Sequence, residues 1–226
     1  VTIKDYTGAD IDDPDEIDST QINLTIDEAK YFNFAVKDVD KAQANVNLLD
    51  GAMGRASYGM ADAIDQDVFG QYADAGIKVG TAAAPTVIDT PAAAYDALVD
   101  LGIKLDEKNV PKAERKVVLP PWFFGLLAKD ARFTRDLNIL ANGVVENATV
   151  GRFQLLQSNN LTTETNGAVH ALAGTTQAIS FANQVVETEA YRPEKNFSDA
   201  VKGLNVWGRK VVQPDCLVDF VISPKA

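Results

Sequence analysis

The first 36 residues carry more strand pattern than a chain of 226 residues can cover with its own body. Apolar and polar residues alternate over residues 1–6 and again over residues 22–36, which is the period-two pattern of β-strands. Between them, residues 7–21 have turn composition, with Gly8, Pro14 and six acids. Because a strand rises about 3.3 Å per residue, a 12-residue arm reaches about 40 Å. The sequence therefore predicts an extended hairpin that finds its packing partners on another molecule.

A long helix is predicted after this hairpin, over residues 40–75, with Asp40 as its N-cap. Its apolar stripe, at steps of three and four, contains Leu49, Met53, Ala56 and Met60. These side chains are expected to form the core of the helix packing, against strands from the last third of the chain. Each glycine inside a helix costs about 1 kcal/mol relative to alanine. The three glycines here favour a start near Asn45 or a bend; they are Gly51, Gly54 and Gly59.

The remaining segments mix short helices and strands, which makes the expected fold class α+β. A turn-rich connection over residues 81–91 precedes a helix that Thr90 caps and that ends near Leu105. Further elements are expected as a strand at 117–119, a helix from Pro121 to about Asp130, a strand at 153–157 and mostly extended chain in the last fifty residues. There is no fixed-period repeat, which excludes solenoids and propellers.

The charge distribution excludes a surface that binds nucleic acid tightly. The net charge is −11, and residues 1–50 alone hold 12 acids and 4 bases, so the rest of the chain is nearly neutral. Binding to DNA requires lysine and arginine to replace its counterions. A protein that encloses nucleic acid without gripping it is compatible with this balance. No apolar run approaches the roughly 20 residues of a membrane span, so no membrane association is expected.

The sequence contains no arrangement typical of catalysis or metal binding. His170 is the single histidine and Cys216 the single cysteine, which does not suffice for a zinc cluster. We expect His170 in or beside a strand with its hydrogen bonding satisfied, and Cys216 as an inert thiol. The acids between residues 10 and 18 superficially resemble a calcium loop but lack its glycine, which favours a solvated acidic tip. We therefore expect no enzyme activity, no cofactor and no metal.

Several stretches resemble the major capsid proteins of tailed bacteriophages, whose fold is named after phage Hong Kong 97. They are YFNFAVKDVDKAQ at 31–43 with DAIDQDVF at 62–69, AERKVVLPPWFFGLL at 113–127, VGRFQLLQSNNL at 150–161, and residues 171–217, which include GLNVWGRKV. The resemblance covers nearly the whole chain, in order. It implies an extended β-hairpin loop, a long spine helix, and peripheral and axial domains. The family has no catalytic residues to carry over.

The resemblance also implies a domain division. Residues 1–36 correspond to the extended loop, with its upstream strand and an N-terminal arm absent; residues 37–80 and 178–226 form the peripheral domain; and residues 81–177 form the axial domain. It further implies a subunit of hexamers and pentamers in the icosahedral capsid of a virion, enclosing double-stranded DNA without sequence-specific binding. Scaffolding, portal and decoration proteins are the implied partners, and the bacterial host cytoplasm is the implied place of assembly.

The extended loop is expected to contact a neighbouring subunit through Val1, Ile3, Lys4, Tyr6, Asp10, Asp12, Asp13, Asp15, Glu16, Asp18, Ile22 and Leu24. Phe32 and Phe34 are expected to be anchored in the core, where the arm joins the body. The acidic tip is expected to meet basic residues of the neighbour, chosen from Lys112, Arg115, Arg132 and Lys195. Two alternatives remain open: an encapsulin-like bacterial compartment shell, and a carboxylate-based hydrolase or sugar-binding module with perturbed pKa values in a pocket.

Overall fold

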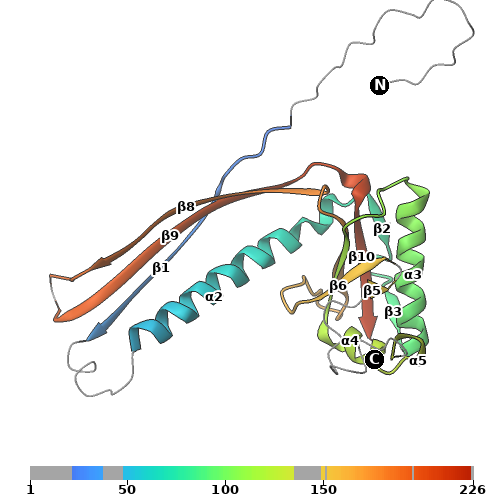
Figure 1. The fold of residues 1–226 in the computed structure, drawn as a ribbon, viewed down its shortest axis with the longest axis horizontal. Coiled ribbons are helices and arrows are strands. Elements are labelled where there is room, and N and C mark those ends of the chain that lie inside the picture. Colours follow the sequence, from blue (N-terminus) through green and yellow to red (C-terminus); the bar gives the residue numbers. More distant parts are fainter. Residues whose placement is uncertain (1–21, 38–47, 135–148, 151, 195, 225–226) are drawn as a thin grey trace, which may run out of the picture.

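The computed structural model describes residues 22–37, 48–134, 149–150, 152–194 and 196–224. The molecule consists of a long arm and a compact domain, joined at one end of the arm (Figure 1). The strand expected at residues 1–6 and the acidic tip at 10–18 lie outside the described residues.

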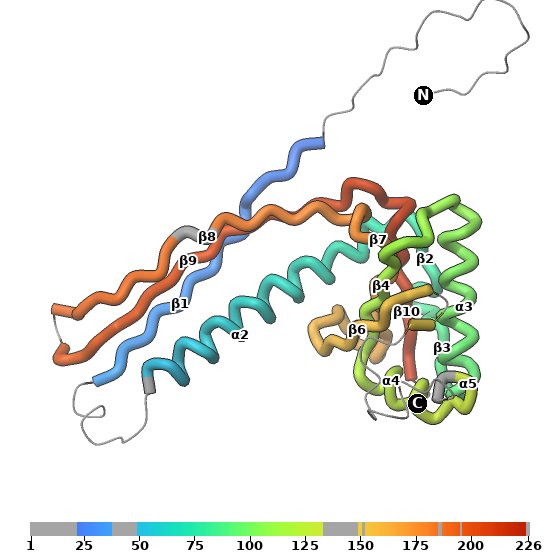
Figure 2. Tube along the Cα trace, viewed as in Figure 1, coloured from blue at the N-terminus to red at the C-terminus, as the bar shows by residue number. Residues whose placement is uncertain are grey.

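The arm is a three-stranded antiparallel sheet with one helix along it. The strands are β1 (Glu28–Lys37), β9 (Ser198–Val211) and β8 (Ile179–Tyr191), in that order across the sheet. Helix α2 (Leu48–Phe69) runs beside the sheet from its far end back to the compact domain (Figure 2). The long helix predicted from the apolar stripe is therefore confirmed from Leu48 onward, and its last predicted turn is the 3-10 helix η1 (Gly70–Asp74) instead.

The strand expected over residues 22–36 begins only at Glu28. The segment before it crosses the face of β9 instead of pairing along its edge. A Cβ atom built on Gly208 would overlap the carbonyl oxygen of Thr25 and lie 2.9 Å from the Cα of Ile26. Only a residue without a side chain lets the backbone cross at this distance.

The compact domain contains a mixed seven-stranded sheet. Its strand order is β2 (Ile77–Val79), β10 (Leu217–Pro224), β7 (Val169–Thr175), β4 (Arg115–Leu119), β6 (Phe153–Gln157) and β5 (Thr149–Val150), and β3 (Thr86–Ile88) also pairs with β10. Of these, β4 and β6 confirm predicted strands. Strand β3 lies in the stretch expected as connecting chain, and no element was predicted at β2; three residues are too few to show a periodic pattern.

Three helices belong to the compact domain: α3 (Pro91–Glu107), α4 (Pro121–Leu127) and α5 (Ala131–Thr134). The predicted N-cap of α3 is confirmed, since the Thr90 hydroxyl accepts a hydrogen bond of 3.2 Å from the Ala93 N–H. The buried face of α3 consists of Ala94, Leu98, Leu101, Gly102 and Leu105. It covers the sheet and supplies much of the apolar core.

Phe32 and Phe34 do not lie in this core, and the expectation for them was wrong. Both are half-buried in the arm, and their rings stack with centroids 6.0 Å apart. The reason is the direction of β1, which runs away from the compact domain toward the far end of the arm (Figure 1). Phe32 pairs with Gly203 and packs on it at a distance that leaves no room for a Cβ atom.

Candidate assembly surface

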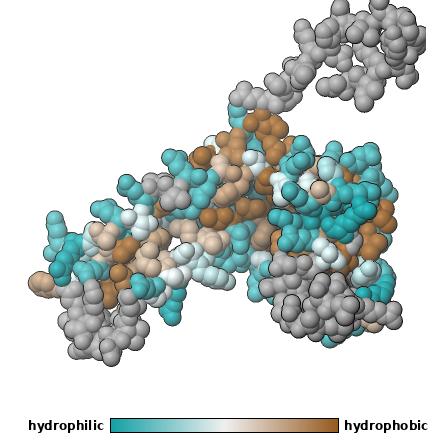
Figure 3. All heavy atoms as spheres, viewed as in Figure 1, coloured by the Kyte–Doolittle hydropathy of each residue, from teal (hydrophilic) through white to brown (hydrophobic). Residues whose placement is uncertain are grey.

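One face of the arm sheet is covered by α2. No described helix or strand covers the other face, which residues 24–26 cross only at Gly208. Phe32 of β1 lines a groove together with Met53 and Met60 of α2. Since side chains alternate along a strand, Tyr31 points to the opposite face. Tyr31 is 78% exposed. Apolar side chains reach the surface along the arm in the space-filling view (Figure 3).

The uncovered face holds a groove of about 440 Å³ that crosses all three strands. It is lined by Tyr31, Asn33, Glu187, Glu189, Lys202, Gly203 and Leu204. Tyr31 pairs with Leu204 in the β1–β9 register, and Leu204 pairs with Glu187 in the β9–β8 register. An apolar floor of Tyr31 and Leu204 thus lies between charged and amide groups, which is the anatomy of a protein–protein contact.

Polar contacts fix the rim of this groove. Lys202 forms an ion pair of 2.9 Å with Glu189 and lies 5.2 Å from the ring centroid of Tyr191. The hydrogen bond to Glu189 is the main reason why the pKa of Lys202 is raised. Tyr191 in turn donates a hydrogen bond of 3.1 Å to Asn33. These contacts link β8, β9 and β1, so the surface is held in shape across the strands.

The four residues of the predicted helix stripe are all half-buried in α2: Leu49, Met53, Ala56 and Met60. Met53 and Met60 line a second groove, of about 330 Å³, which is shared with Phe32, Leu204 and Asn205 of the arm sheet. Arg209 of β9 binds Asp67 of α2 at 2.6 Å and lies within 3.4 Å of both Asp27 and Glu28. One guanidinium therefore holds together the helix and the Glu28 end of the β1–β9 pairing.

Of the residues expected to contact a neighbour, only two are described. Ile22 is exposed, and Leu24 is half-buried with its side chain close to Gly208. The other ten, from Val1 to Asp18, lie outside the described residues. Sequence reasoning did not single out Tyr31 or Phe197. Phe197 is 87% exposed beside the turn between β8 and β9, and its neighbours Asn196 and Ser198 give no signal for this position.

Two of the basic residues expected to meet the acidic tip, Arg115 and Arg132, form ion pairs within the chain. Arg115 is buried and donates to Asp106 and to the Val110 carbonyl at 2.7 Å each, and to the Gly102 carbonyl at 3.3 Å. The first of these bonds is the main reason why the pKa of Asp106 is lowered. Lys112 is half-exposed, 3.8 Å from the same carboxylate, and Lys195 lies outside the described residues.

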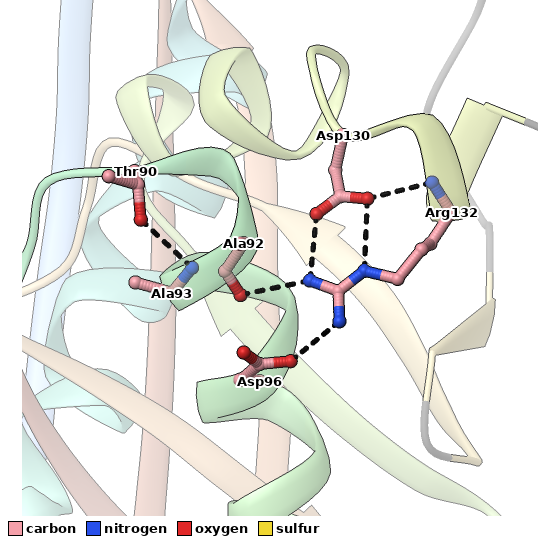
Figure 4. A network of polar contacts seen from close by, with 6 residues as sticks. All are labelled: Thr90, Ala92, Ala93, Asp96, Asp130 and Arg132. Carbon is pink, nitrogen blue, oxygen red and sulfur yellow. Dashed lines mark hydrogen bonds and ion pairs between the residues drawn. The ribbon is translucent and has the colours of Figure 1, made fainter.

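Arg132 forms a closed network with α3 (Figure 4). It binds Asp130 at 2.9 Å and Asp96 at 2.8 Å, donates to the Ala92 carbonyl, and lies 4.4 Å over the ring of Tyr95. The hydrogen bonds that Arg132 donates to Asp130 and Asp96 raise the pKa of its guanidinium. Arg132 therefore attaches α5 to α3 and is not a free cation on the surface.

A polar pocket of about 310 Å³ lies between α2 and the end of β6. Asp62 and Asp65 line it, and Asn160 donates a hydrogen bond of 2.6 Å to Asp62. Burial, and secondly the charge of Asp62, raise the pKa of Asp65. Within the described residues, no three histidine, cysteine or acidic side chains come together as a possible metal site.

His170 lies in β7, as expected, with Nδ1 2.9 Å from a carboxylate oxygen of Asp219. Burial raises the pKa of Asp219, and the hydrogen bond to His170 opposes this shift. Cys216 is buried, and its Sγ lies 3.3 Å from the side-chain oxygen of Gln213. None of the described helices is long and apolar enough to cross a membrane.

A long helix lying on a three-stranded arm that projects from a compact mixed sheet is the Hong Kong 97-type capsid fold. A structure from Mycobacterium phage Che8 has a TM-score of 0.73 and 25% sequence identity, over 89% of this chain and 72% of that one. The capsid structure of cyanophage P-SCSP1u has a TM-score of 0.70 and 16% identity, over 100% and 80%. An encapsulin complex from Synechococcus elongatus has a TM-score of 0.58 and 13% identity, over 88% and 73%.

The sequence model of the family described as "Phage capsid protein" matches residues 20–220, and the chain belongs to this family. The protein is thus a structural component of a phage capsid, and the expected fold and function are confirmed. No curated protein sequence matches the chain.

Proposed function

We propose that this chain is the shell-building subunit of an icosahedral capsid, and that the uncovered face of its arm is a contact between subunits. The observation that carries the proposal is the groove around Tyr31 and Leu204, an apolar surface on a sheet that is covered on one side only. Such patches on otherwise polar proteins mark interaction sites. In a closed shell the partner is another copy, and heterologous contacts are repeated around each symmetry axis.

In this proposal the subunits form hexamers and pentamers that enclose double-stranded DNA. The near-neutral charge of residues 51–226 supports a wall that surrounds DNA without sequence-specific contacts. Scaffolding, portal and decoration proteins would bind the same shell, which assembles in the cytoplasm of the bacterial host. The phage structures have higher TM-scores than the encapsulin complex, which favours a virion over a bacterial compartment.

The proposed division of labour follows the two parts of the molecule. Residues 1–36 act as the extended loop that packs on a neighbouring subunit. Residues 37–80 and 178–226, which supply α2, β8 and β9, form the peripheral domain. Residues 81–177, which supply α3 to α5 and five strands of the compact sheet, form the axial domain near the centre of the capsomer. Because the loop packs on a neighbouring subunit, folding and assembly are partly coupled.

The test is a charged substitution at the groove. Tyr31→Asp places an unpaired carboxylate on the apolar floor, where a neighbour would bury it at a large cost. We expect a folded subunit that no longer forms shells under electron microscopy and sediments as small species. Gln184→Asp is the matched control, because it adds the same charge at an exposed polar residue of the same sheet, outside the groove. Normal shells from Tyr31→Asp would overturn the proposed contact.

A further inference from the structure

The only histidine of the chain lies where the arm meets the compact domain. The His170 ring stacks on Tyr72 with centroids 3.9 Å apart. Tyr72 belongs to η1, which continues directly from α2. His170 itself is in β7, and its partner Asp219 is in the adjacent strand β10. One imidazole therefore contacts the end of the spine helix and two central strands of the sheet.

The two ring nitrogens of His170 are in different situations. Nδ1 lies 2.9 Å and 3.1 Å from the two carboxylate oxygens of Asp219, so it carries the proton and donates. Nε2 is buried without a hydrogen-bond partner, and the nearest carboxylate oxygen, on Glu164, is 3.4 Å away. In the neutral ring, Nε2 is an acceptor that faces another acceptor. A second proton turns it into a donor toward Glu164.

The charged and titratable groups around the ring come from four elements. Asp219 is on β10, Tyr72 on η1, and Glu164 in the tight turn before β7, where its backbone bonds to Ala168. Lys78 of β2 donates to the Ala73 carbonyl of η1 and acts electrostatically on Asp219. The Glu164 side chain is 37% exposed, which gives solvent protons a route to the buried Nε2.

We propose that His170 is a proton-operated latch between the spine helix and the compact domain. In mild acid, Nε2 takes up a proton and binds the Glu164 carboxylate, while the ring becomes a cation against the face of Tyr72. At neutral pH the link to Glu164 is absent. The joint is therefore held more firmly in mild acid than at neutral pH.

Two substitutions at Glu164 separate this latch from a general effect of pH. In Glu164→Gln the amide N–H can donate to the neutral Nε2, so the link is present at both pH values. In Glu164→Ala the link is absent at both. Because Glu164 is partly exposed and lies in a turn, neither change removes a core side chain. His170→Gln provides a further variant without a titrating ring.

The experiment uses the full chain as unassembled subunits, at about pH 5.5 and about pH 7.5. NMR of ¹⁵N-labelled histidine reports on His170 alone, and hydrogen exchange corrected for its intrinsic pH dependence reports on residues 70–76. We expect Nε2 to be protonated only at the lower pH, with protection of 70–76 several-fold higher there. Glu164→Gln should show the higher protection at both pH values, and Glu164→Ala and His170→Gln the lower.

The proposal is overturned by either of two results. One is an Nε2 that stays unprotonated at the lower pH. The other is a wild-type pH dependence of protection that persists unchanged in Glu164→Ala. Because the subunits are unassembled, neither result depends on whether the arm contacts a neighbour.

Discussion

The indole N–H of Trp207 donates a hydrogen bond of 2.8 Å to the carboxylate of Asp67 and thereby attaches the central strand of the arm sheet to the spine helix. Trp207 is fully buried in β9, and Asp67 also receives the ion pair from Arg209 at 2.6 Å. One carboxylate near the end of α2 thus serves two donors of β9. The position of the helix along the sheet depends on it.

Replacing Asp67 tests this connection. Asp67→Ala leaves the buried indole N–H of Trp207 without its acceptor and removes the shortest ion pair of Arg209, and we expect a loss of about 2 kcal/mol in unfolding free energy. Asp67→Asn keeps an oxygen for Trp207 and should lose less. Denaturant unfolding of unassembled subunits measures both. Equal stability of Asp67→Ala and wild type would show that the helix is positioned by apolar contacts alone.

Arg115 should be essential for the compact domain. Arg115→Met removes the donor to the carbonyl oxygens of Gly102, Pro111 and Val110 and to the Asp106 carboxylate, and we expect a loss of about 3 kcal/mol. Lys116→Met is the control at the exposed neighbouring position on the same strand. The unfolding midpoints of the two variants test this prediction. Similar midpoints would show that the buried hydrogen bonds of Arg115 do not stabilise the compact domain.

The lowered pKa of Asp106 predicts one part of the acid unfolding curve. Its folded-state pKa lies below the unfolded value, chiefly through the hydrogen bond from Arg115. The bonded carboxylate therefore stabilises the protein above the unfolded pKa of about 3.9, and this contribution is lost as the pH falls through the folded value. Asp106→Asn should flatten the stability curve below about pH 4. An unchanged acid limb would contradict this.

Two glycines should respond to alanine with opposite signs. A Cβ on Gly54 of α2 meets no described atom within 4 Å, so Gly54→Ala should gain up to about 1 kcal/mol from helix propensity. At Gly208 a Cβ would overlap the Thr25 carbonyl, so Gly208→Ala should displace residues 24–26 from β9. Thermal unfolding reports the first effect, and faster hydrogen exchange over residues 22–27 the second.

Removing the acidic segment should weaken assembly without preventing folding. A chain lacking residues 9–19, closed by a short turn, loses six acids that are proposed to meet cations of a neighbour. We expect fragile, salt-sensitive shells in electron microscopy of preparations at low and high ionic strength. Shells of normal yield and stability would exclude the segment as an assembly element.

The parts of the fold that were predictable are those with a local cause. The stripe through Met53 and Met60 indicated α2, and Thr90 followed by Pro91 marked the start of α3. Strand β7 gave no such signal, because every residue from Val169 to Thr175 is buried and the sequence does not alternate. A strand of this kind is recognised only by the sheet around it.

The surface was less predictable than the fold. Alternation placed Tyr31 opposite Phe32, but it does not say which face of a strand a helix covers. Arg115 and Arg132 have the sequence context of ordinary surface cations, and their engagement depends on carbonyl and carboxylate groups brought near by tertiary packing. Local sequence pattern therefore carries the least information about which side chains lie on the surface and how they are paired.

The arm reverses direction twice at its far end, once between β1 and α2 and once between β8 and β9 (Figure 1). Strands β8 and β9 both connect the far end of the arm to the compact domain, where the Val212 N–H donates a hydrogen bond of 2.9 Å to the Ala178 carbonyl. A force that pulls the tip away from the compact domain is therefore carried by the covalent backbones of β8 and β9, which are already extended, and not by hydrogen bonds. The arm therefore resists stretching along β8 and β9.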